Sequence, residues 1–204
     1  MHLAIKLMID NMKKENDENF LVMKASHEAL KKYEGMVQID KKDLENFLRK
    51  FLGLIRDENF SVVYSERTIE SLKVGIVGSV DVIGFKNSEV VPIEIKYASF
   101  KGKMKKEHLL QAIGESILVG SYFRKEVKYC YVVYFQTSSL IKVEMNKSLI
   151  SQFFSLKKQM KRFYSIGKIP PKSRLPNYIK RVCQGCHVKK ACDNIEILRR
   201  VRIF

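Results

Sequence analysis

Three charged side chains interrupt a strongly apolar stretch in the first half of the chain. Asp81, Glu94 and Lys96 lie among the Val and Ile residues of two predicted strands, 76–85 and 89–97, and these residue types favour strands. Because successive side chains of a strand alternate between its faces, Glu94 and Lys96 share one face. Two carboxylates and an amine in this pattern could bind a divalent cation through oxygen and hold a water or a phosphate beside it.

The turn between the two strands decides which charged residues face each other. A two-residue loop at residues 87–88 would pair Lys86 with Glu89. The same register places Asp81 directly opposite Glu94, at a separation of roughly 5 Å where like charges destabilise a sheet unless a cation lies between them. The alternative is a solvated strand face with one ordinary ion pair, because antiparallel sheets often keep one face in water.

The composition indicates a protein that binds a polyanion. The 204 residues include 38 Lys and Arg against 22 Asp and Glu, which gives a formal net charge of +16. Fourteen basic and two acidic residues follow position 156, so the excess is concentrated in the last quarter. Nucleic acid is the usual partner of such a charge. Because no apolar run reaches the roughly 20 residues that span a bilayer, we expect a cytoplasmic protein without a membrane partner.

Amphipathic segments around the two strands predict an α/β domain. Apolar residues at helical spacing predict helices over 20–33, 41–55, 107–123 and 147–164. Further strands are expected over 60–64, 127–135 and 140–145. We therefore expect a mixed sheet of about five strands flanked by helices within residues 1–165, with a basic segment, 166–204, packed on it as one domain.

A charged loop and a polar helix stripe follow the second strand. The loop carries Lys101, Lys103, Lys105 and Lys106, which suit a phosphate backbone, although a solvated loop fits equally well. Tyr97 could stack on an unpaired base, and core packing explains it as well. Gln111 and Glu115 share one polar stripe of the next helix, which faces either the hairpin carboxylates or water.

Three cysteines gather in ten residues of the basic segment. Cys183 and Cys186 have the C-x-x-C spacing that grips one metal, and Cys192 can close around it. Cysteines clustered in this way indicate a metal site in a reducing cytosol rather than a disulfide framework. Zinc would take a fourth ligand such as His187 or Cys130, while a [4Fe–4S] cluster normally takes four thiolates. The spacing alone slightly favours zinc.

Together these motifs resemble the PD-(D/E)XK nuclease superfamily in its RecB-like form. Asp81, the tripeptide Glu94-Ile95-Lys96 and a helix with Gln111 match its core, and His27 matches the histidine of its early helix. The three clustered cysteines are similar to those of the CRISPR-associated RecB-like iron–sulfur nucleases, the fourth Cas family. The resemblance covers about residues 20–192, and it implies a restriction-endonuclease-like core.

The resemblance also implies a metal-dependent deoxyribonuclease. His27, Asp81, Glu94 and the backbone carbonyl of Ile95 would bind Mg²⁺ or Mn²⁺. Lys96 would position the attacking water and help to deprotonate it, beside a cation that stabilises charge on the scissile phosphate.

Further implications of the resemblance concern substrate and partners. Gln111 would orient the site, and the cluster ligands Cys183, Cys186 and Cys192 would fasten the C-terminal segment over the core. The expected substrate is single-stranded DNA, cut from its ends, often 5′ to 3′, or internally. The expected partners are the CRISPR integrase proteins.

Two departures from the family pattern stand out. No cysteine precedes Cys130, whereas the family has its first cluster cysteine upstream of the early helix, and Glu115 stands where the family has a tyrosine in Q-x-x-x-Y. These departures suit a stand-alone or virus-borne homologue as well as a CRISPR nuclease. Two other hypotheses are a non-catalytic nucleic-acid-binding module with a structural zinc knuckle, and a junction-resolving endonuclease that shares the core without the cysteines.

Overall fold

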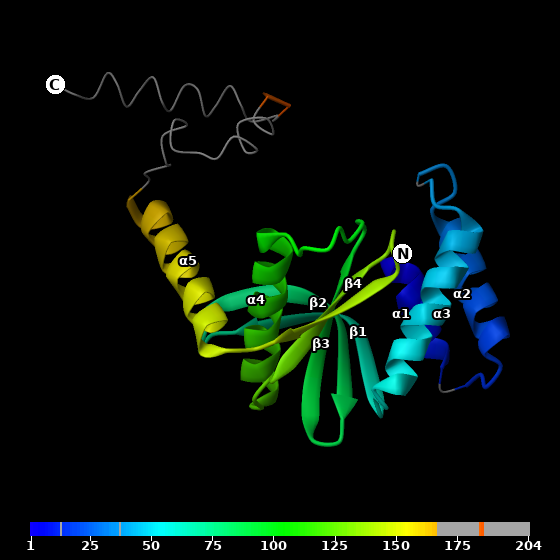
Figure 1. The fold of residues 1–204 in the computed structure, drawn as a ribbon, viewed down its shortest axis with the longest axis horizontal. Coiled ribbons are helices and arrows are strands. Elements are labelled where there is room, and N and C mark those ends of the chain that lie inside the picture. Colours follow the sequence, from blue (N-terminus) through cyan, green and yellow to red (C-terminus); the bar gives the residue numbers. More distant parts are fainter. Residues whose placement is uncertain (13, 37, 167–183, 186–204) are drawn as a thin grey trace. The chain divides into compact units, whose positions relative to one another are not determined.

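The computed structural model describes residues 1–12, 14–36, 38–166 and 184–185 (Figure 1). Their elements, in chain order, are α1 (His2–Asn11), α2 (Glu18–Lys32), α3 (Lys41–Asp57), β1 (Val62–Ser71), β2 (Ile76–Lys86), β3 (Glu89–Lys96), α4 (Lys106–Phe123), β4 (Tyr129–Tyr134), β5 (Ser139–Glu144) and α5 (Lys147–Ile166). The chain divides into two compact units, Met1–Phe153 and Phe154–Phe204. The division expected at residue 165 lies near the end of α5 and stays a prediction.

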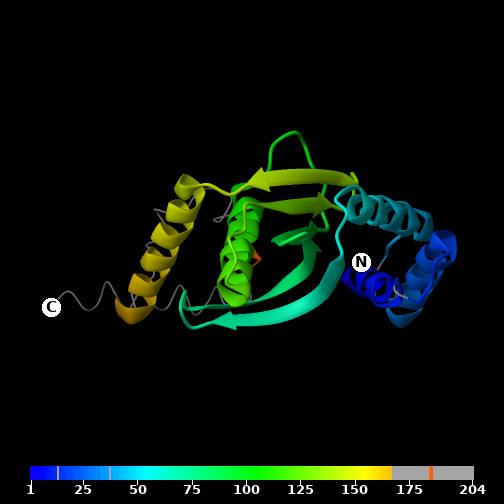
Figure 2. The same ribbon diagram turned by 90° about the horizontal axis from the view of Figure 1, so that it is seen from below.

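The first unit is built on a mixed sheet in the order β1-β2-β3-β4-β5. β3 runs parallel to β4, and every other neighbouring pair is antiparallel. The parallel pair follows from the chain path, because α4 carries the chain back across the sheet between β3 and β4 (Figure 2). The predicted α/β fold class, a mixed sheet flanked by helices, is therefore confirmed, and it agrees with a restriction-endonuclease-like core.

Helices cover both faces of this sheet. Two of the helices on one face begin at aspartates: Asp17 caps α2 and Asp40 caps α3, each accepting bonds from backbone N–H groups of the first turn. The apolar stripe of α3, including Phe47, Leu48 and Phe51, is buried in a core with α1, α2, Val82 of β2 and alternate residues of β3 and β4. α4 packs on the opposite face through residues such as Ile113 and Leu118. None of the described helices has an apolar stretch long enough to cross a bilayer.

The central hairpin has the register that the sequence predicts. Lys86 pairs with Glu89 across the two-residue turn, where Asn87 adopts a left-handed φ of 54°. The β2–β3 ladder ends at Val82 and Ile93. Beyond that pair, β2 continues alongside β1, and β3 continues alongside β4. The two hairpin strands therefore separate at Asp81 and Glu94, two of the predicted site residues.

Candidate active site

Asp81 lies on β2 where the two strands separate. Its Oδ2 accepts a hydrogen bond from the backbone N–H of Ile95 on β3 at 2.8 Å. The carboxylate therefore replaces the missing ladder contact, rather than facing Glu94 across a regular pair as the sequence analysis expected. The Asp81 side chain is 17% exposed. It therefore links β2 to β3 and is still partly accessible from the gap between the two strands.

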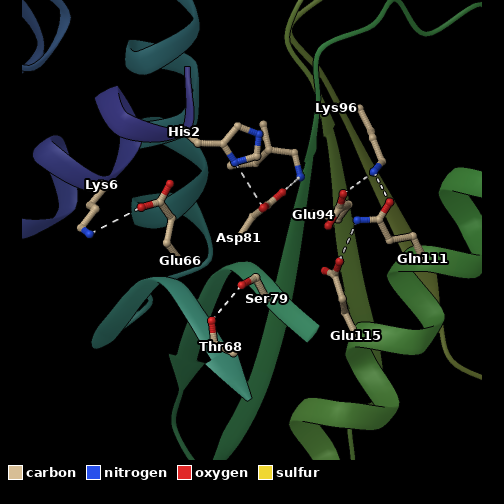
Figure 3. A network of polar contacts seen from close by, with 11 residues as sticks. His2, Lys6, Glu66, Thr68, Ser79, Asp81, Glu94, Lys96, Gln111 and Glu115 are labelled. Carbon is tan, nitrogen blue, oxygen red and sulfur yellow. Dashed lines mark hydrogen bonds and ion pairs between the residues drawn. The ribbon is translucent and has the colours of Figure 1, made fainter. Parts of the chain in front are cut away.

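Glu94 and Lys96 form a largely buried ion pair on β3. Glu94 is 2% exposed, and its Oε1 is bound by the Lys96 ammonium group. Lys96 also donates to Oε1 of Gln111, which projects from α4 (Figure 3). Because a buried carboxylate without a compensating charge is strongly destabilising, the Lys96 ammonium group stabilises the ionised form of Glu94. Three of the predicted residues are thus joined in one network.

The network continues to Glu115, one turn further along α4. The Nε2 group of Gln111 donates to Glu115 Oε1 at 3.1 Å, and Glu115 is only 7% exposed. Burial, followed by the hydrogen bond and the charge interaction with the neighbouring carboxyl group of Glu94, raises the pKa of Glu115 to about 10. The polar stripe of α4 therefore faces the hairpin carboxylates. Sequence reasoning placed Glu115 on this stripe and noted it as a departure from the family pattern, but did not include it among the site residues.

The histidine at this site is His2 rather than the expected His27. His2 opens α1, and its Nδ1 lies 3.2 Å from Asp81 Oδ1. The hydrogen bond to Asp81 raises the pKa of His2, because it favours the charged imidazolium. His27 is exposed on α2, and no contact in the described part of the chain joins it to Asp81 or Glu94. No sequence pattern marked His2 as a candidate site residue.

One feature of Asp81, Glu94 and Ile95 fits a divalent cation bound through oxygen: a buried carboxylate oxygen without a partner. Among the described residues, no three His, Cys, Asp or Glu side chains gather closely enough to hold an ion by themselves. Of the expected ligands, Asp81, Glu94 and the backbone carbonyl of Ile95 remain as candidates, because His27 lies exposed on α2. Glu94 Oε2 is buried without a hydrogen-bond partner, and such an orphaned carboxylate oxygen suits a hard cation such as Mg²⁺ or Mn²⁺.

A basic pocket adjoins the end of β3. It has a volume of about 360 Å³, and its lining residues are Tyr97, Ala98, Ser99, Lys101, Lys103, Lys105, Tyr134 and Gln136. Tyr97 stacks on Phe135 with 5.2 Å between ring centroids, yet 53% of it is exposed. Its ring therefore packs on the core and also presents itself to solvent. Lys106, the remaining predicted lysine, is exposed at the start of α4.

The cysteine-cluster prediction cannot be placed in the described structure. Cys183, Cys186 and Cys192 lie outside the described residues. Cys130, a suggested fourth ligand, is buried as a free thiol within β4, and burial raises its pKa to about 11. A thiol in that state is typical of a core residue.

Comparisons with known proteins add little to this geometry. No family model matches the sequence, and no curated protein matches it. Among solved structures, one described as "Crystal structure of SSO0001" is similar over 91% of this chain and 91% of its own, with 16% sequence identity and a TM-score of 0.41. This similarity is too low to indicate function.

Proposed function

We propose that this chain is a metal-dependent deoxyribonuclease of the RecB-like class that hydrolyses phosphodiester bonds, with single-stranded DNA as its preferred substrate. One observation carries the proposal: Asp81, Glu94 and Lys96 meet where β2 and β3 separate, and one buried oxygen of Glu94 has no partner. The structural alternative of a solvated strand face with one ordinary ion pair does not account for a 98% buried carboxylate with an orphaned oxygen.

Each residue of the site has a distinct proposed role in the hydrolysis. Asp81, Glu94 and the Ile95 carbonyl would hold Mg²⁺ or Mn²⁺, which supplies Lewis-acid stabilisation of the phosphate when bound. Lys96, fixed by Glu94 and Gln111, would position the attacking water and help to remove its proton. The water oxygen bonds to phosphorus, the bond from phosphorus to the leaving sugar oxygen breaks, and that oxygen takes up a proton.

The pocket beside the site supports DNA as the substrate. Lys101, Lys103 and Lys105 give it a charge suited to phosphate oxygens, and the half-exposed ring of Tyr97 offers a surface for an unpaired base. Base stacking of this kind requires an unstacked strand, which is why we propose single-stranded DNA. A role in CRISPR adaptation or in viral or cellular DNA processing, and an iron–sulfur or zinc site in the C-terminal segment, remain part of the proposal.

The test is cleavage of single-stranded DNA by an Asp81→Asn variant in Mn²⁺. Because the amide keeps the shape of the carboxylate but removes its charge, we expect cleavage to fall by on the order of 10³-fold, as several kcal/mol of cation-dependent stabilisation are lost. Asp57→Asn, a substitution at an exposed aspartate at the end of α3, is the matched control and should retain activity. Unchanged cleavage by Asp81→Asn would contradict the assignment.

A further inference from the structure

An arginine held between two tyrosine rings lies outside the candidate active site. The guanidinium carbon of Arg67, on β1, is 5.6 Å from the ring centroid of Tyr64 and 5.9 Å from that of Tyr122, on α4. Arg67 also donates a hydrogen bond to the Tyr122 hydroxyl at 3.2 Å, and all three side chains are exposed. These contacts fix the orientation of the guanidinium group while its other N–H groups stay available to a ligand.

The arginines of the first unit differ in their charge partners. Arg49 and Arg56 each form an ion pair with a glutamate. Arg67 and Arg124 contact no carboxylate within the described residues. Because the guanidinium group is a planar fork that matches phosphate oxygens, an ordered arginine without a carboxylate partner is suited to bind a phosphate.

A second basic pocket adjoins Tyr122, with a volume of about 700 Å³. Its polar lining includes Lys73, Arg124 and the hydroxyl groups of Ser71 and Ser121, with Glu70 as the one carboxylate among the lining residues. Ser71 is 7% exposed and shares a hydrogen bond of 2.6 Å with Ser121. One of these hydroxyls donates to the other, so the second O–H group is left to donate to a ligand. Cations and a hydroxyl donor together suit an anion.

Tyr122 lies on the same stripe of α4 as two residues of the candidate active site. Gln111, Glu115 and Tyr122 are spaced at i, i+4 and i+11, which returns to one face after about three turns. Tyr122 follows Glu115 by seven residues, or about 10 Å of helix at roughly 1.5 Å per residue. A stacked strand covers that distance with about three nucleotides at roughly 3.4 Å each. One strand can therefore reach both places.

We propose that Arg67 and the Lys73–Arg124 pocket bind backbone phosphates of the same single-stranded DNA, about three nucleotides from the bond that is cut. The proposal deepens the proposed nuclease function and rests on it for the identity of the strand. The lysine pocket at β3 includes Lys105, which precedes the first turn of α4, whereas Tyr122 lies in its last turn. The two basic sites would thus hold the strand on both sides of the reacting phosphate.

The competing explanation is structural, because Arg67 also connects β1 to the end of α4 through Tyr122. A purely structural arginine would lower the free energy of unfolding when it is replaced, but it would not change the dependence of DNA binding on salt. A phosphate contact changes that dependence, because it releases a counterion from the strand. The salt slope therefore separates the two explanations.

The deciding experiment is fluorescence titration of labelled single-stranded DNA of about 12 nucleotides, a typical site size, at several salt concentrations and without divalent cations. Since each phosphate contact contributes about 0.7, we expect the slope to fall by about 0.7 in Arg67→Gln and by about 1.4 in the double variant with Arg124→Gln. Arg56→Gln, at an exposed arginine that pairs with Glu18, carries the same change in charge as Arg67→Gln and should keep the wild-type slope.

Two results of this titration would overturn the proposal: an unchanged slope in the folded double variant, or an equal loss in Arg56→Gln. If Arg67→Gln does not fold, Arg124→Gln alone still gives the test, because the Arg124 side chain has no hydrogen bond or ion pair within the described residues. Vesicles of phosphatidylserine provide the second probe. Vesicle binding that depends on Arg67, with an unchanged DNA slope, would assign the site to lipid headgroups and also overturn the proposal.

Cleavage assays on the same proteins separate this inference from the proposed function. A slope that depends on Arg67, in a wild type that does not cleave DNA in Mn²⁺, would uphold the phosphate site and reject the nuclease. Cleavage by wild type with equal slopes in all variants would uphold the nuclease and overturn the phosphate site.

Discussion

Because Glu94 and Lys96 are largely buried, each needs the other's charge, and substitution of either one is expected to destabilise the fold. The side chains are 2% and 16% exposed, respectively. Removing one member of a buried pair leaves an uncompensated charge and typically costs about 3–5 kcal/mol. Substitution of Lys96 therefore affects stability as well as chemistry, and a variant that keeps a hydrogen-bond donor at this position is the more informative one.

A second polar cluster, at the end of α3, contributes to stability rather than to the site. Glu58 accepts hydrogen bonds from the hydroxyl groups of Tyr131 and Tyr129 and pairs with Lys86 at 3.3 Å. The Tyr131 bond is the largest cause that lowers the pKa of Glu58 below its ordinary value of 4.5. The ionised Glu58 is therefore the form that the fold stabilises.

We predict that Tyr131→Phe lowers the free energy of unfolding by about 1.5–3 kcal/mol near neutral pH, because a hydrogen bond to a charged acceptor is lost. Since the pKa of folded Glu58 is lowered, this contribution is present in full above 4.5 and disappears as the pH falls through the lowered value. Denaturant unfolding of wild type and variant across this pH range measures the difference.

Tyr64→Phe is the control for that prediction. The Tyr64 hydroxyl makes no hydrogen bond within the described residues, and its ring packs edge-on against Phe85 at 5.9 Å. Its removal should change stability little at any pH. A loss for Tyr131→Phe that stays constant from neutral to acidic pH would show that the Glu58 bond is not its source.

At the residue scale, the sequence pointed to candidate site residues where a charged side chain lies within an apolar segment. Asp81, Glu94 and Lys96 were proposed as site residues because charges are out of place in an apolar hairpin whose register is fixed by a short turn. His2 and Glu115 were not identified as site residues. A lone histidine on a helix has no such conflict, and the burial of Glu115 depends on how α4 packs on the sheet, which no local pattern contains.

Two glycines in helices differ in what surrounds them. A Cβ at Gly53, on α3, would meet nothing within 4 Å. A Cβ at Gly120, on α4, would lie 2.9 Å from the carbonyl oxygen of Lys125, where the chain turns back after the left-handed Arg124. Gly120 therefore permits a close backbone approach, while Gly53 has no packing role on its Cβ side.

We predict opposite effects for alanine at these two positions. Gly53→Ala should raise the free energy of unfolding by about 0.5–1 kcal/mol, because the unfolded chain loses conformational freedom. Gly120→Ala should lower it by about 1–3 kcal/mol, because the backbone must shift to relieve the contact. Chemical denaturation of both variants provides the test, and stabilisation by Gly120→Ala would contradict the close approach.

At the element scale, helices and buried strands were predicted well and the polar strand poorly. The apolar stripe of α3 and the turn of the central hairpin are local signals, and both appear as expected. The first strand was expected over 60–64 but extends to Ser71 as β1. Its second half is largely polar, and it pairs with the outer part of β2, where a hydroxyl contact joins Thr68 to Ser79 at 2.9 Å. Pairing with β2, and not the strand propensity of its own residues, therefore stabilises the second half of β1.

At the scale of the whole molecule, the net charge of +16 would make the proposed binding of DNA a salt-dependent process. We predict that replacing Lys101, Lys103 and Lys105 together with glutamine reduces the salt slope of single-stranded DNA binding by about two, since each phosphate contact contributes about 0.7. Fluorescence titrations at several salt concentrations measure the slope.

A triple variant of Lys14, Lys31 and Lys32 carries the same change in net charge and serves as the control. These lysines are exposed and lie away from the pocket lining. If both triple variants reduce the slope equally, the pocket lysines act only through the overall charge, and the predicted phosphate contacts are wrong.

The central claim is that Lys96 and its neighbours perform phosphodiester hydrolysis. The most direct measurement is cleavage of end-labelled single-stranded DNA in Mn²⁺ by wild type, Lys96→Ala and Lys96→Gln, with binding measured in parallel. General acid–base assistance and water positioning are worth about 10² to 10⁴-fold. We therefore predict a loss of that size in both variants, with DNA binding retained and folding verified by thermal melts. Absence of cleavage by folded, Mn²⁺-loaded wild type, or full activity of Lys96→Gln, would contradict the account and favour a non-catalytic nucleic-acid-binding module.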